Sequence, residues 1–181
     1  MIDINLLYEI LLKKNIPSLE KEIFELVPEL KFEKNFEQKS EWHCFDVWNH
    51  TLATIEACDM NAEDRLVMLL HDIGKPFSYQ DDGKSRHFKG HAKKSAEMAK
   101  IILDRFNIDE ENKELILKLI EFHSTKINAD DINQNNINFY KRLLNIQKYD
   151  ASGYEKEHSK MVLDNLQHFG YLFEYLFLEN K

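Results

Sequence analysis

The chain is poor in the residues that break helices or cross-link a fold: it has five glycines, three prolines and two cysteines among 181 residues. With so little glycine and proline, almost every segment can follow a helical period, which argues against a fold of many short strands and turns. Cys44 and Cys58 do not form a CxxC pair. The sequence therefore predicts reduced, packed thiols and no disulfide framework.

Long apolar runs and an excess of positive charge are also missing. No charge-free apolar segment is long enough to span a bilayer, and the N-terminus, MIDINLLYEI, is acidic, unlike a secretion signal. We therefore expect a cytoplasmic protein. The 24 Lys and Arg residues face 32 Asp and Glu residues, a net charge of −8, which argues against non-specific binding of nucleic acid. A small anionic substrate remains compatible where bound metal ions reverse the local field.

The hydrophobic pattern predicts an all-α protein that forms a single domain over residues 1–181. We expect N-terminal helices within 1–30, a metal-binding core at 42–150 and a C-terminal helix at 155–181. Eight helices are expected, at about 3–14, 18–27, 46–59, 62–73, 90–106, 110–124, 136–150 and 156–178. The longest loop, 77–90, contains an Asp-Asp-Gly turn that is compatible with a short hairpin.

A histidine and an aspartate end the most hydrophobic run of the chain. Leu66–Leu70 leads directly into His71 and Asp72, within the stretch LLHDIGKP. Burying a carboxylate without a partner costs roughly several kcal/mol of stability. Asp72 therefore requires a cation or a proton if it lies inside the protein.

Other polar residues also stand where the apolar stripe of a helix predicts a core residue. Taken singly, each is a hydrogen-bonded core histidine or a solvated helix end. Together they occupy the ends of five helices, and a shared divalent cation would compensate all of them. The set is His50, His71, Asp72, His91, His123 and Asp150.

The order of these residues resembles the H…HD…D signature of the HD superfamily of metal-dependent phosphohydrolases. His91 and His123 resemble the additional histidines of its two-metal members. The segments FELVPEL, HCFDVWNHTL, LLHDIGKP and HFKGH are similar to the HD region of bacterial tRNA nucleotidyltransferases, over roughly residues 20–150. No glycine-rich loop or pair of catalytic aspartates precedes residue 20, so we do not expect nucleotide-adding activity.

The resemblance implies an HD-domain-like helical bundle with its metal site between the central helices. It implies that one ion is held by His50, His71, Asp72 and Asp150, and that Asp72 bridges to a second ion held by His91 and His123. Imidazoles with carboxylates suit Mn, Fe, Co, Ni or Zn, so we expect one or two such ions per chain. The implied activity is hydrolysis of a phosphate ester, with a nucleotide favoured as substrate, through a metal-activated water.

Asp72 and Lys75 are the residues expected to be catalytic. Lys75 either holds a substrate phosphate as a point charge or complements a helix C-terminus. Arg86 and His87 belong to a basic loop that either rims the substrate pocket or is an ordinary charged loop. Arg142 is either a phosphate contact or a surface arginine.

Two other functions share the same ligand set: a di-iron oxygenase of the HD fold, and a non-catalytic module that binds or senses a nucleotide. The basic loop that follows HDIGKP favours hydrolysis. His43 is expected to lie near the site, with a supporting or proton-transfer role as a hypothesis. The last helix carries an aromatic stripe that is either core or the interface of a homodimer. Its members are Phe169, Tyr171, Phe173, Tyr175 and Phe177.

Overall fold

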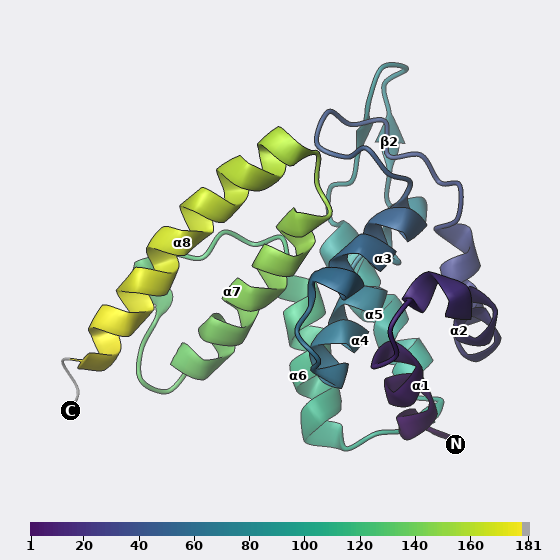
Figure 1. Cartoon of the computed structure of the whole chain (residues 1–181), viewed down its shortest axis with the longest axis horizontal. Coiled ribbons are helices and arrows are strands. Elements are labelled where there is room, and N and C mark those ends of the chain that lie inside the picture. Colours follow the sequence, from purple (N-terminus) through teal and green to yellow (C-terminus); the bar gives the residue numbers. More distant parts are fainter. Residues whose placement is uncertain (179–181) are drawn as a thin grey trace.

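The computed structural model describes the backbone of residues 1–178, and their side chains except those of Leu172 and residues 176–178. Eight α-helices fill most of this part of the chain (Figure 1), and each corresponds to one of the expected helices. The all-α prediction is confirmed. The helices are α1 (Ile4–Leu11), α2 (Glu20–Leu26), α3 (Val47–Ala57), α4 (Ala62–Leu70), α5 (His91–Leu103), α6 (Glu110–Phe122), α7 (Ile137–Ser152) and α8 (Lys156–Leu178).

Side-chain caps fix the starts of the helices that carry the site. Asp46 accepts a hydrogen bond from the backbone N–H of Asn49 at the start of α3, and Asn61 accepts from Glu63 and Asp64 at the start of α4. Asp109 caps α6 in the same way. Each cap satisfies backbone donors that have no partner within the helix.

Helix α4 runs through the centre of the fold. Its residues Leu66–Leu70 are fully buried, because α1, α3, α6 and α7 all pack against it. The helix ends at Leu70, three residues earlier than expected, and a 3₁₀ turn follows at Lys75–Phe77. His71 and Asp72 therefore lie at the buried C-terminal end of the central helix.

Two short strand pairs interrupt the helical pattern. β1 (Ile2–Asp3) pairs in parallel with β4 (Phe106–Asn107). Because the buried Phe106 belongs to this strand pair, α5 ends before it, at Leu103. β2 (Gln80–Asp81) and β3 (Arg86–His87) form the antiparallel hairpin that the long loop allowed, and the hairpin projects from one end of the molecule (Figure 1).

Helices α7 and α8 lie side by side at one flank of the molecule (Figure 1). Of the aromatic stripe, Phe173 is buried and Phe169 is half-buried, whereas Tyr171 and Tyr175 are exposed. The side chain of Phe177 lies outside the described residues. The inner half of the stripe therefore joins the core, and the outer half faces solvent.

Buried apolar residues from α1 to α8 form one continuous core. Within residues 1–178, no helix combines the length and apolar character that crossing a bilayer requires.

Candidate metal centre

The six expected metal ligands converge from five helices. His50 lies on α3, the pair His71–Asp72 directly follows α4, and His91 is the first residue of α5. His123 directly follows α6, and Asp150 lies in the last turn of α7. All are buried except His91, whose side chain is 16% exposed. Helix ends therefore place every ligand, as their positions in the sequence suggested.

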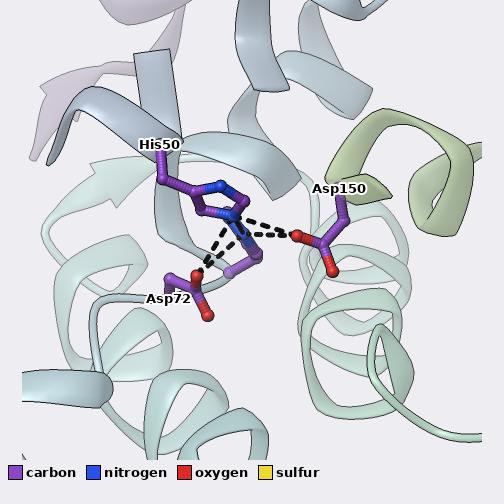
Figure 2. A group of neighbouring side chains, drawn as sticks. His50, Asp72 and Asp150 are labelled. Atoms are coloured by element: carbon purple, nitrogen blue, oxygen red, sulfur yellow. Dashed lines mark hydrogen bonds and ion pairs between the residues drawn. The ribbon is translucent and has the colours of Figure 1, made fainter. Parts of the chain in front are cut away.

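The first group of ligands contains His50, His71, Asp72 and Asp150. Figure 2 shows His50, Asp72 and Asp150 pointing toward one another from three separate elements. The Nε2 atom of His50 lies 3.0 Å from Oδ1 of Asp150, 3.3 Å from Nε2 of His71 and 3.4 Å from Oδ2 of Asp72. Ligands about 2.0–2.2 Å from one ion lie roughly 3–3.5 Å from their neighbours, so this spacing fits one divalent ion.

The second group shares Asp72 with the first and adds His91 and His123. The Nε2 atoms of the two histidines are 3.1 Å apart. They lie 3.4 Å and 3.7 Å from Oδ1 of Asp72, which is the oxygen that faces away from His50. Asp72 thus presents one oxygen to each group.

In all four histidines, a backbone carbonyl holds the Nδ1 atom of the ring. Their Nδ1 atoms lie 2.7–3.0 Å from carbonyl oxygens, which only accept hydrogen bonds. Each Nδ1 therefore carries the proton and donates it, which leaves the lone pair of a neutral imidazole on Nε2. The Nε2 atoms are the ones that converge, as a metal site requires. The carbonyls belong to Gly153, Met68, Phe88 and Ile120, for His50, His71, His91 and His123 respectively.

Opposite charges compensate one another at the site. Burial alone would raise the pKa of the Asp72 and Asp150 carboxyl groups. The positive charges of His71 and Lys75 hold the pKa of Asp72 well below its usual range, and hydrogen bonds from His50 and His71 do the same for Asp150. Burial would lower the pKa of His71, yet the two carboxylates raise it to about 10. Burial lowers the pKa of His123 to about 3 and also lowers that of His91. In the metal-free protein His71 therefore carries a second proton, on Nε2, and a metal must displace that proton.

Lys75 also neutralises Asp72. Its ammonium group is buried, lies 2.6 Å from Oδ2 of Asp72 and donates to Oε1 of Gln38 at 2.7 Å. No aligned donor forms a hydrogen bond with either Asp72 oxygen among the described residues. Two buried carboxylate oxygens without hydrogen-bond donors, surrounded by imidazole Nε2 atoms, fit the inner face of a metal site.

Further residues support the ligands, and the sequence pattern did not identify three of them. The Tyr154 hydroxyl donates to Oδ2 of Asp150 at 2.9 Å, and Gln38 holds Lys75. The backbone of Gly153 holds His50. His43, expected near the site, has its ring centre 5.1 Å from that of His50 in an edge-to-face contact, and its Nδ1 is buried without a hydrogen-bond partner.

The side chains of Arg86 and His87 contact residues of the β2–β3 hairpin and of the segment beside it. Arg86 pairs with Asp81 at 3.2 Å, donates to the Glu37 carbonyl and covers the ring of Phe36. His87 is exposed and pairs with Asp82 at 3.2 Å. In this arrangement both side chains stabilise the hairpin.

The structure does not bring Arg142 to the ligands. Its guanidinium pairs with Asp64 at 2.6 Å and Glu63 at 2.8 Å, in the first turn of α4. The His71–Asp72 pair lies at the opposite end of that helix, about 10 Å away at 1.5 Å per residue. Arg142 therefore joins α7 to α4, and its guanidinium is paired away from the proposed phosphate position.

A bundle whose helix ends gather histidines and aspartates at one buried point is a metal-binding all-α domain, and comparison with known families agrees. The HD domain family model matches residues 43–160, which is more than half of the chain. The chain belongs to the HD domain family, whose members are generally metal-dependent phosphohydrolases. The His/Asp cluster fits the divalent metal site typical of these domains.

One curated protein is similar to part of this chain. The A-adding tRNA nucleotidyltransferase of Deinococcus radiodurans is 30% identical over an alignment of 112 residues, which covers 58% of this chain and 26% of that protein. This chain thus matches about a quarter of that protein's length.

Proposed function

We propose that this protein is a metal-dependent phosphohydrolase that cleaves a phosphate ester of a nucleotide. The observation that carries the proposal is the shared carboxylate. Oδ2 of Asp72 faces His50 and His71, and Oδ1 faces His91 and His123. Such a bridge between two ligand groups supports a pair of ions that acts on the attacking and leaving oxygens of a displacement.

The chain contributes orientation and charge to this chemistry. Divalent ions at the site would supply a water of lowered pKa and polarise the phosphoryl oxygen. Tyr154 holds one oxygen of Asp150 and leaves the other facing His50. Lys75 is buried beside Asp72 and oriented by Gln38, so we assign it a phosphate oxygen of the substrate, as a fixed positive charge.

The similarity to a tRNA nucleotidyltransferase does not extend this proposal to nucleotide addition, because the match covers only 26% of that protein. We propose a small nucleotide as the substrate, because the net charge of −8 disfavours non-specific binding of nucleic acid. A cytoplasmic location and a homodimer formed through α8 belong to the same proposal.

The test combines elemental analysis of the purified protein with phosphate release from a panel of mono- and dinucleotides, with Mn, Co, Ni or Zn added. We expect one or two equivalents of metal and release from at least one nucleotide. An Asp72→Asn variant provides the control for contaminating phosphatases.

Other results would reject hydrolysis. Bound iron with a mixed-valence signal and no release would support the di-iron oxygenase. A tightly bound nucleotide that stays intact would support a sensing module. Failure to retain any added metal would contradict the metal site itself.

A further inference from the structure

A groove leads from the metal ligands along α8. Its inner part is a cavity of about 230 Å³, which reaches His123 and Asp150 at one end and Val162 and Leu166 of α8 at the other. Its outer part is a cavity of about 580 Å³ that extends to Asn165 and Phe169. Lys126, Gln147 and Leu166 line both cavities, so the two are adjacent. We call this space the α7–α8 groove.

The chemistry of the groove changes along its length. The inner end holds two metal ligands together with Ser124 and Thr125. The exposed cation Lys126 stands where the two cavities meet. The outer end combines the half-buried ring of Phe169 with the polar side chain of Asn165.

We propose that the α7–α8 groove binds the nucleoside part of the substrate while its phosphate lies at the metal ligands. A nucleoside has a flat apolar face and polar edges, and the outer groove offers an aromatic ring and hydrogen-bonding groups to match them. Lys126 lies where the phosphate would join the nucleoside, and its positive charge complements the negative charge of the phosphate. The proposal rests on the proposed function, because it places the phosphate at the metal site.

The length of the groove agrees with this assignment. Val162 lines the inner cavity and Phe169 the outer cavity. Seven residues separate them on one helix, a rise of about 10 Å. A free phosphate ion would fill only the inner end, so the outer end is suited to a substrate that extends beyond its phosphate.

The first experiment compares Phe169→Ala with Tyr171→Ala, a matched aromatic deletion on the exposed side of α8. The rates measured are kcat/KM for nucleoside monophosphates and for phenyl phosphate, which has no base or ribose. In Phe169→Ala we expect kcat/KM for the nucleotide to fall about tenfold more than that for phenyl phosphate, equivalent to about 1.4 kcal/mol. Tyr171→Ala should leave the ratio of the two kcat/KM values unchanged.

A second pair of variants keeps the test valid if Phe169→Ala fails to fold, since Phe169 packs against the core. Asn165 is exposed and lines the groove, whereas Gln167 is exposed and does not. Asn165→Ala should lower the preference for nucleotides, mainly by raising KM, and Gln167→Ala should not. Equal losses for both substrates in the groove variants, or no losses, would overturn the proposal.

The same assays separate the two proposals. If the wild-type protein hydrolyses phenyl phosphate but no nucleotide, the groove assignment fails and phosphohydrolase activity stands. If it hydrolyses neither, calorimetric titration of the metal-loaded protein with nucleoside monophosphates decides. Binding that Asn165→Ala weakens would support the groove without turnover, and no binding would reject it.

Discussion

Three of the four metal-site histidines are oriented by their own helix ends. His71, His91 and His123 each donate from Nδ1 to the carbonyl three residues earlier, that of Met68, Phe88 and Ile120. Local backbone therefore directs their Nε2 atoms before any ion binds. His50 differs, because its Nδ1 donates to Gly153, 103 residues away. Its orientation depends on tertiary structure.

We expect Asp72→Asn to lose both ions. Each Asp72 oxygen faces one ligand group, and the amide that replaces it has no charge and only one acceptor oxygen. Metal affinity should fall by more than the roughly 10–100-fold that loss of a supporting group costs. Equilibrium dialysis measures the bound equivalents.

Asp130→Asn, the same change in the exposed 3₁₀ turn Ala129–Asp131, serves as the matched control and should retain its metal. Full metal content in Asp72→Asn would show that the bridging role is assigned to the wrong residue.

Glu33 should make the metal-free protein less stable as the pH rises. Burial raises the pKa of its carboxyl group to about 8, and the charge on Asp72 adds to the rise. Because the folded pKa exceeds the ordinary value of 4.5, the stabilisation is complete below about pH 4.5 and is lost as the pH rises to about 8. Within that window each pH unit should cost at most about 1.4 kcal/mol.

Glu33→Gln removes this titration and keeps the shape of the side chain. Thr51 donates to the carboxyl group at 3.1 Å and can donate to the amide oxygen instead. Denaturant unfolding of both proteins in chelator, from pH 5 to pH 9, should show a steeper loss in the wild type. Parallel curves would mean that Glu33 does not titrate in this window.

At the scale of helices, periodicity in the sequence predicted all eight described helices and the six residues that the site brings together. These residues could be found because imidazoles and carboxylates at apolar positions are costly without compensation. Gln38, Gly153 and Tyr154 could not be found in this way. Gln38 and Gly153 contact residues that are distant in sequence, Lys75 and His50. Tyr154 contacts Asp150 only four residues away, but its hydroxyl breaks no apolar pattern that would mark it.

The contact between α3 and the end of α7 should be sensitive to one methyl group. A Cβ atom at Gly153 would lie 2.5 Å from Nδ1 of His50, so the ring must move. The backbone of Gly153 has a φ of −86°, which alanine adopts without strain. We therefore expect Gly153→Ala to weaken metal binding at the His50 group about 10–100-fold, as measured by competition with a chromophoric chelator.

Gly170→Ala is the matched control. The nearest atom to a Cβ at Gly170 is Nζ of Lys148 at 4.0 Å, so this helix should accept the methyl group. Metal binding unchanged in both variants would show that the orientation of His50 is not fixed by α7.

At the scale of the molecule, the metal site connects five helices. The ligands come from α3, α5, α7 and the ends of α4 and α6. Sequence pattern could place them on helices but could not supply the pairing of those helices. The same limit explains Arg142, since its position on α7 was visible but its acidic partners on α4 were not.

Because the ions would link five helices, their removal should lower the stability of the whole fold. A ligand present at about 1,000 times its Kd stabilises a protein by about 4.1 kcal/mol. For a chain of this size each kcal/mol shifts Tm by about 2–4 °C, so adding Mn or Zn to chelated protein should raise Tm by about 8–16 °C. Calorimetry measures the shift. Ca, which prefers oxygen ligands, should give a smaller one, and Asp72→Asn should give none. Equal Tm shifts in Asp72→Asn and in the wild type would show that the stabilising ion binds outside the His/Asp cluster. The cluster would then not be the site that holds the five helices together.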